Sequence, residues 1–227
     1  LDWWSIQREG TIQSLALSTL FANYKLFPDR FLYNNGVLTF VDDRWINAGE
    51  TSTKGLEFGL RHNANVGGGK LSTGLDISYL LEKKSRLLAS QPFGASEIGR
   101  FTRSGDLGIR WKHSAFVTYA QGDWSGTLNQ QYRGGYVDYV LPGVASGAVK
   151  PPEWNARVNS YLLHHASVTY KGIKNLSLSV GIKNIFNEDP PFSAAYDSDT
   201  GAGSSWEPRV ADPRGRSYNL AATYTFW

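Results

Sequence analysis

Apolar and polar residues alternate along several stretches of this chain. In residues 216–227, Tyr218, Leu220 and Tyr224 fall in one alternate set, and Asn219 and Thr223 fall in the other. Alternation with a period of two is typical of a β-strand with one apolar face, because successive side chains point to opposite sides of a sheet. The pattern predicts eight strands, at residues 1–8, 53–66, 70–85, 109–121, 124–136, 157–171, 176–186 and 216–227.

The connections between the predicted strands alternate between long and short. Residues 67–69, 122–123 and 172–175 contain glycine and predict tight turns, because glycine adopts positive φ angles without strain. The first long connection includes a helical pattern at residues 15–21 and a short strand at residues 37–42. Compact soluble domains seldom contain several long loops. Short turns at one end and long loops at the other are typical of outer-membrane β-barrels.

The two alternate sets differ in character. One set is aliphatic and aromatic, whereas the other contains Ser, Thr, Asn, Gln, Gly and scattered charges, which suits a water-filled lumen. A soluble barrel would place the apolar set inside and a more strongly charged set outside. We therefore expect the apolar set to face lipid, with Tyr218 in one aromatic girdle and Tyr224 and Phe226 in the other. The predicted lipid-facing residues are Leu178, Val180, Val168, Tyr218, Leu220, Tyr224 and Phe226.

Composition agrees with this interpretation. The 227 residues include eight Trp and twelve Tyr but no Cys, and aromatic residues suit both membrane-interface belts and ligand-facing loops. A mean hydropathy of −0.35, with no run of eighteen apolar residues, excludes a protein that crosses a membrane with helices. The net charge of +3 is spread along the chain, unlike the clustered basic face of a nucleic-acid-binding protein.

Candidate catalytic and metal-binding patterns are weak. The adjacent His164 and His165 would point to opposite faces of a strand and so could not share one ion. Residues 197–201 resemble the start of a calcium loop, but the sixth position is Ala202 and the twelfth is Pro208. No nucleophile elbow, phosphate loop or dinucleotide fingerprint occurs. The sequence predicts neither an enzyme nor a metal or cofactor site.

The end of the chain carries an ordered set of motifs. Residues 184–187 read NIFN and residues 188–192 read EDPPF, and Tyr196 and Asp197 follow within a Gly- and Ser-rich loop before residues 215–218, GRSY, and an aromatic finish. This set resembles the C-terminal end of TonB-dependent receptors, although the chain ends on Trp227, one residue past the usual terminal Phe. The resemblance implies an all-β fold, a transmembrane antiparallel up-and-down β-barrel. This chain would supply about eight C-terminal strands of 22.

The resemblance also implies a function and a setting. Residues 1–227 would be the C-terminal portion of the barrel domain, without the N-terminal plug and the earlier strands. The protein would be an outer-membrane active transporter of a Gram-negative bacterium, importing a scarce, bulky nutrient such as a ferric siderophore or an oligosaccharide. Its expected partners are the TonB energy-transducing complex, outer-membrane lipid and lipopolysaccharide, the rest of the same barrel, and the extracellular nutrient.

Ligand contact is expected on the long loops, where aromatic faces stack on rings and Arg pairs with anions. The candidate residues are Trp45, Tyr136, Tyr139, Trp154, Tyr196, Trp206 and Arg209. The alternative is that these side chains only pack the loops together. Two other architectures also stay open: a self-contained eight-stranded outer-membrane barrel, acting as an adhesin or enzyme, and a soluble β-sandwich binding module.

Overall fold

The computed structural model describes residues 1–13, 15, 17–47, 49–89, 91–101, 107–138, 144, 146–150, 156–193 and 205–226. The chain forms two compact units. The first contains Leu1–Trp4, Lys54–Leu81 and Glu97–Trp227, and the second contains Ser5–Thr53 and Glu82–Ser96. Among the described residues, no helix is long and apolar enough to cross a membrane.

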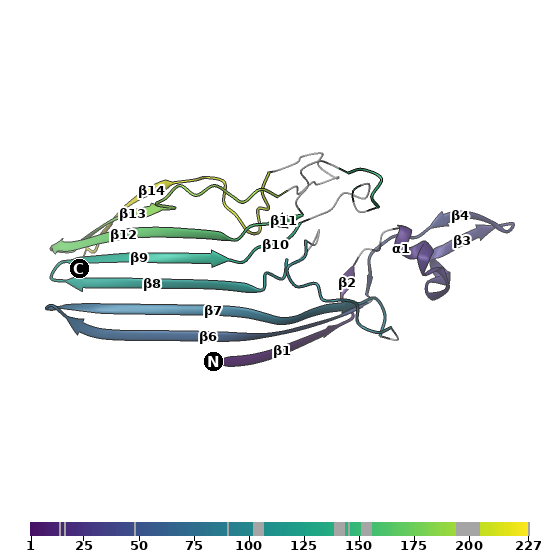
Figure 1. The fold of residues 1–227 in the computed structure, drawn as a ribbon, viewed down its shortest axis with the longest axis horizontal. Helices are drawn as coiled ribbons and strands as arrows, with labels where there is room; N and C mark the ends of the chain where they lie inside the picture. Colours follow the sequence, from purple (N-terminus) through teal and green to yellow (C-terminus); the bar gives the residue numbers. More distant parts are fainter. Residues whose placement is uncertain are drawn as a thin grey trace. The chain divides into compact units, whose positions relative to one another are not determined.

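An eight-stranded sheet dominates the fold, in the order β1-β6-β7-β8-β9-β12-β13-β14 (Figure 1). Chain neighbours pair antiparallel, as β7 does with β8 and β13 with β14. Its strands are β1 (Asp2–Glu9), β6 (Glu50–Val66), β7 (Gly69–Arg86), β8 (Trp111–Gln121), β9 (Trp124–Arg133), β12 (Tyr161–Ile173), β13 (Leu176–Lys183) and β14 (Ser217–Tyr224). These are the eight predicted strands, with ends that differ by a few residues. Strands β1 and β14 each have a single neighbour, so the sheet is open rather than closed into a small barrel.

Short turns connect the strands at one end of the sheet, as predicted. Gly67 and Gly68 have φ angles of 55° and 81° between β6 and β7, which is the conformation of a two-residue hairpin turn. Asn175, with φ of 62°, makes the turn between β12 and β13, because Asn tolerates the left-handed region better than most residues. Because the turn consists of residues 174 and 175, strand β12 runs to Ile173, two residues beyond its predicted end at residue 171.

Two predicted strand ends on the loop side were wrong. Strand β9 stops at Arg133, not at residue 136, and Tyr136–Val137 forms a separate strand, β10. It pairs with β11 (Arg157–Val158), which is likewise separate from β12. Gly134 and Gly135 allow this break, since a Cβ at Gly135 would collide with the backbone oxygen of Val158.

A small core holds the loop side of the first unit. It consists of Leu107, Ile109, Tyr136, Val158 and Val210, with Phe101 packed against them. The contributing segments are far apart in sequence, so this core joins the loops that follow β7, β9 and β13. The eight-stranded sheet thereby carries a folded loop cluster at the end opposite its short turns.

The second unit contains the first long connection. Helix α1 (Leu17–Ala22) and the short strand β4 (Val37–Val41) confirm the predicted helical pattern and strand. Its core is formed by Leu15, Leu20 and Phe31. The other elements are β2 (Ile12–Gln13), which pairs with β5 (Ile46–Asn47), β3 (Phe31–Asn34), which pairs with β4, and the 3-10 helices η1 (Tyr24–Leu26) and η2 (Pro28–Arg30).

Candidate ligand site on the polar face of the sheet

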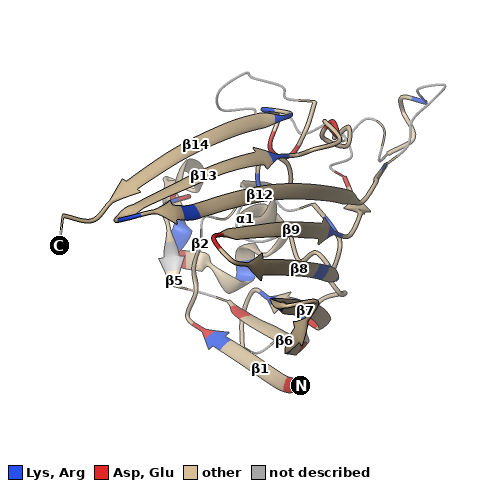
Figure 2. Ribbon diagram, turned by 90° about the vertical axis from the view of Figure 1, so that its left-hand side faces the viewer, with Lys and Arg blue, Asp and Glu red and all other residues tan. Residues whose placement is uncertain are grey.

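The register of the strands separates a polar face from an apolar face. Asn129 lies opposite both Phe116 and His165, and Gly181 lies opposite both Ser167 and Asn219, and directly paired residues share a face. Few charged residues interrupt the strands, as the mostly tan ribbons of Figure 2 show. The polar face of β9, β12 and β13 carries Thr127, Asn129, Gln131, Arg133, His165, Ser167, Ser179 and Lys183.

The predicted lipid-facing residues lie on the other face, except Phe226, which follows the end of β14. Val168 pairs with Val180, and Val180 pairs with Leu220. Their exposed fractions reach 79% at Leu220 and 70% at Tyr218, and only Leu178 of this set is half-buried. Within the described part of the chain, no layer of protein covers this apolar face.

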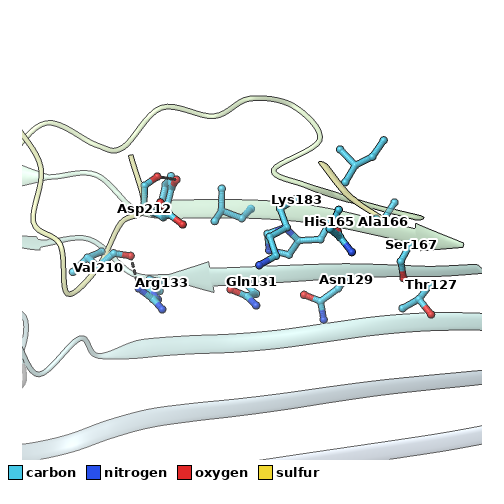
Figure 3. A pocket seen from close by; sticks show the side chains of 15 residues that line it. Thr127, Asn129, Gln131, Arg133, His165, Ala166, Ser167, Lys183, Val210 and Asp212 are labelled. Atoms are coloured by element: carbon cyan, nitrogen blue, oxygen red, sulfur yellow. Dashed lines mark hydrogen bonds between the residues drawn. The ribbon is translucent and has the colours of Figure 1, made fainter. Parts of the chain in front are cut away.

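A pocket of about 490 Å³ opens on the polar face beneath the loop cluster (Figure 3). Strands β9, β12, β13 and β14 form its floor, and residues 210–212 of the last loop lie at its rim. Three of its side chains are basic or imidazole groups: Arg133, His165 and Lys183. The amides of Asn129, Gln131 and Asn219 lie between them. The pocket therefore offers mainly hydrogen-bond donors and positive charge.

Arg133 joins the pocket to the loop above it. Its guanidinium donates to the backbone oxygens of Arg209, at 3.2 Å, and of Val210. No carboxylate among the described residues lies within 4.0 Å of Arg133 or Lys183. The one acidic residue of the pocket, Asp212, pairs with Arg214 at 2.5 Å. Hydrogen bonds from the Arg214 side chain and backbone lower the pKa of Asp212 to about 2, so this carboxylate stays ionised and paired.

His165 has a fixed orientation in the pocket. Its Nδ1 accepts a hydrogen bond from the backbone N–H of Asn184 at 3.0 Å. The neutral ring therefore carries its proton on Nε2, and it presents a donor rather than an acceptor to its surroundings. His164 lies on the opposite face, as predicted for adjacent strand residues, and its Nε2 contacts Gln130 at 3.0 Å. No group of three metal-ligating side chains occurs in the described part of the chain.

A buried polar network ties the loops above the pocket together. Ser193 donates to Asp138 at 2.9 Å, and the Glu207 carboxylate holds the Arg209 guanidinium at 2.8 Å. That guanidinium also lies over the Phe101 ring, 5.3 Å from its centre. Burial alone would raise the pKa of Glu207, but the hydrogen bonds and charge of Arg209 outweigh it and lower the pKa.

Tyr136 lies inside this network, with only 3% of its surface exposed. Burial raises the pKa of Tyr136 to about 12; Ser193 acts against this rise, and the charges of Asp138 and Glu207 add to it. Its hydroxyl makes no hydrogen bond of ordinary geometry within the described residues. Loop packing is therefore the observed role of this side chain, and ligand contact by it stays a prediction.

The other ligand candidates are scattered. Trp45 belongs to the second unit and is 69% exposed, so its indole is available to a ligand. Trp206 is half-buried. The Arg209 guanidinium forms an ion pair with Glu207 and lies over the Phe101 ring. Tyr139, Trp154 and Tyr196 lie outside the described residues. Contact between these residues and a ligand stays a prediction.

Sequence reasoning did not single out the pocket. Arg133, His165 and Lys183 come from three different strands, and their proximity depends on register. Residues 210–212 reach the pocket only through the folded loop. A usable signal was the run of donors at alternate positions of β9: Asn129, Gln131 and Arg133.

Three solved structures share the fold of this chain. Two crystal structures of mutants of the ferric enterobactin receptor PfeA from Pseudomonas aeruginosa match with a TM-score of 0.58, at 17% and 16% identity over 99% and 98% of this chain. The FrpB iron transporter from Neisseria meningitidis matches with a TM-score of 0.52, at 14% identity over 98% of this chain. This chain spans 28% of the length of each.

Sequence comparison gives the family directly. Among curated proteins no sequence match was found. The family profile described as TonB dependent receptor-like, beta-barrel matches residues 2–185, which is well over half of the chain. The chain therefore belongs to the TonB-dependent receptor family, whose β-barrels lie in the outer membrane of Gram-negative bacteria.

Proposed function

We propose that this chain forms part of the barrel wall of an outer-membrane transporter that imports a scarce, bulky nutrient with energy from a TonB complex. The observation that carries the proposal is the family match over residues 2–185, on a sheet whose two faces differ as a membrane barrel requires. Members of this family act as receptors and transporters rather than as enzymes. Transport is therefore favoured over catalysis.

The open edges of the sheet support a place for this chain in a larger barrel. The backbone groups of β1 and β14 are unpaired on one side, and an unpaired edge is not tolerated in hydrocarbon. The chain also spans 28% of the receptors it matches. We propose that both edges pair with further strands of the same barrel, that a plug domain occupies its lumen, and that the apolar face contacts lipid.

The polar pocket supports an anionic or polyhydroxylated cargo. Arg133, His165 and Lys183 present donors toward the lumen side, and charge-assisted hydrogen bonds to anions are the strong ones. Two of the matched structures are named for ferric enterobactin and the third as an iron transporter. We propose a ferric siderophore as the first substrate to test, with an oligosaccharide second. Loop residues such as Trp45 and Trp206 would make the first contacts.

Uptake by whole cells tests this function. The complete receptor would be expressed in a strain that lacks its own siderophore receptors, with and without the TonB protein. We expect cells to accumulate radioactive iron from at least one ferric siderophore only when the receptor and the TonB protein are both present. A matched panel of labelled oligosaccharides serves as the second arm. Equal uptake with and without TonB, across both panels, contradicts the proposal.

A further inference from the structure

A row of hydrogen-bonded side chains crosses the apolar face of the sheet near its loop end. The row consists of Trp111, His113, Gln130 and His164, from β8, β9 and β12. The Trp111 indole N–H donates to His113 Nδ1 at 2.9 Å, and His113 Nε2 lies 3.1 Å from Gln130 Oε1. Gln130 Nε2 lies 3.0 Å from His164 Nε2. Three neighbouring strands are therefore linked by side chains as well as by their backbones.

Trp111 sets the direction of every hydrogen bond in this row. An indole nitrogen can only donate, so His113 Nδ1 must accept, and the proton of the neutral ring must lie on Nε2. The Gln130 oxygen then accepts from His113, and the Gln130 amide donates to His164 Nε2. A protonated imidazole has no acceptor nitrogen. The first and last hydrogen bonds of the row therefore each require a neutral imidazole.

Protonation of His113 breaks the row at Trp111. A second proton on this ring can bind only at Nδ1, the atom that accepts from the indole, so two N–H groups would then face each other. Rotation of the Gln130 amide cannot restore the bond, because Gln130 contacts the other nitrogen of the ring. Trp111 has no second acceptor within the row. A charged His113 and a bound Trp111 indole are therefore mutually exclusive.

The surroundings of His113 offer no counter-ion for a charged ring. Its ring stacks on Tyr132 from β9 at 5.0 Å between centres, and its partner on β7 is Ile77. The titratable and charged groups on this face around it are Tyr79, Arg110, Tyr132 and His164. None of these groups is a carboxylate, and Arg110 adds a positive charge. Within the described residues, a proton on His113 thus breaks one hydrogen bond and gains no ion pair.

Trp111 stands where the loop cluster enters the sheet. It is the first residue of β8 and directly follows Leu107 and Ile109, which are buried in the core of the loop cluster. The Trp111 backbone oxygen accepts from the Gly134 N–H at 2.8 Å, at the end of β9. The bond to His113 adds a side-chain anchor at the same point. Loss of that bond leaves the backbone pairing in place but frees the indole.

We propose that this row is an acid-sensitive anchor of the loop cluster. Imidazoles change charge between about pH 5 and pH 8, and above this range a neutral His113 holds the Trp111 indole. As the pH falls through the range, protonation of His113 releases the indole, and residues 107–111 are held less firmly. The loop cluster borders the polar pocket, so its order becomes dependent on external pH. The inference goes beyond the proposed transport and does not depend on which nutrient is carried.

Fluorine NMR of the purified complete receptor tests the anchor. The protein would be labelled with 5-fluorotryptophan, and the Trp111 resonance would be identified by its absence from Trp111→Phe. In the wild type this resonance should shift in one titration step between about pH 8 and pH 5. His113→Asn keeps an oxygen acceptor near the position of Nδ1 but does not titrate, so the shift should disappear. His62→Asn removes an imidazole from the same face near the short-turn end and should leave the shift unchanged.

Hydrogen exchange measures the effect on the loops. Exchange of residues 107–111, corrected for intrinsic rates, should be about threefold faster at about pH 5.5 than at about pH 7.5 in the wild type. It should be equal at both pH values in His113→Asn. Trp111→Phe lacks the anchor at every pH and should exchange fast throughout, so it keeps the test valid if His113→Asn does not fold.

Three outcomes overturn the proposal. These are a Trp111 resonance that does not titrate, one that titrates equally in His113→Asn, or a shift that His62→Asn also removes. Uptake assays separate this proposal from the transport function. A Trp111 indole that ignores pH leaves TonB-dependent uptake intact, and failure of uptake leaves the titration of the purified receptor valid.

Discussion

Asn184 holds His165 in place where β13 ends. Its backbone N–H donates to His165 Nδ1 at 3.0 Å, while its own side chain closes a turn by accepting from the Glu188 N–H at 2.8 Å and donating to the Glu188 oxygen at 2.9 Å. Asn184 is buried and has a φ angle of 51°. One residue thus orients a pocket imidazole and starts the loop from which Val210 and Asp212 line the pocket.

Replacing Asn184 should therefore destabilise the receptor. We expect Asn184→Ala to lower the free energy of unfolding by about 2 kcal/mol, because it removes two buried hydrogen bonds at a positive φ angle. Asn184→Gly removes the same bonds but tolerates the backbone, so it should cost less. Urea unfolding in lipid vesicles measures both. Equal stability of Asn184→Ala and the wild type contradicts the role of this turn.

Tyr136 should make the loop cluster sensitive to alkali. Its pKa is raised to about 12 in the fold, above the ordinary value of 10.0. A raised pKa contributes stability that is present below pH 10 and is lost as the pH rises toward 12. Tyr136→Phe should remove this alkaline loss. The difference in phenolate absorbance between the wild type and the variant follows the titration of this one group. If that difference rises near pH 10 rather than near pH 12, Tyr136 is not buried as described.

Glu207 should make the same cluster sensitive to acid. Its folded pKa lies below the ordinary 4.5, so its contribution to stability is present above pH 4.5 and is lost as the pH falls through the folded value. Hydrogen exchange of residues 205–216, corrected for intrinsic rates, should accelerate in that range. Glu207→Gln should show fast exchange already at neutral pH. If both proteins exchange alike at pH 7, the Glu207–Arg209 pair does not order this loop.

The two faces of β14 should differ in their tolerance of charge. Leu220→Arg puts a guanidinium on the apolar face and should cost about 2–4 kcal/mol in a membrane. Ala221→Arg, one residue away on the polar face, should cost much less. Unfolding in vesicles compares them, and spin labels at both positions report access to water and lipid reagents. A label at Leu220 that is reached only by water reagents would show that the faces are inverted.

Lys183 should contribute to cargo affinity. Its ammonium lies on the polar face in the pocket with Arg133 and His165. For whichever labelled nutrient passes the uptake test, Lys183→Gln should weaken binding about fivefold if that nutrient is anionic. Lys70→Gln removes the same charge from the polar face at the short-turn end and should leave affinity unchanged. Similar losses in both variants would point to net charge rather than to this pocket.

Alternation alone predicted the eight long strands, because the pleat of a strand sends every second side chain to the same face. It also placed Leu220 and Val180 on one face and separated His164 from His165. Glycine and asparagine marked the short turns for an equally local reason, since these residues adopt positive φ angles. The family motif in residues 184–218 indicated a membrane barrel.

Only the tertiary structure decided which residues meet. The pocket requires Arg133, His165 and Lys183 to lie side by side, and that depends on strand register across β9, β12 and β13. The Gly134–Gly135 break was missed because its cause is the close approach of Val158, a long-range contact. Tyr136 shows the same limit: its sequence position suited a ligand-facing loop, and burial against Leu107 and Val210 became apparent only once three distant loops had packed together.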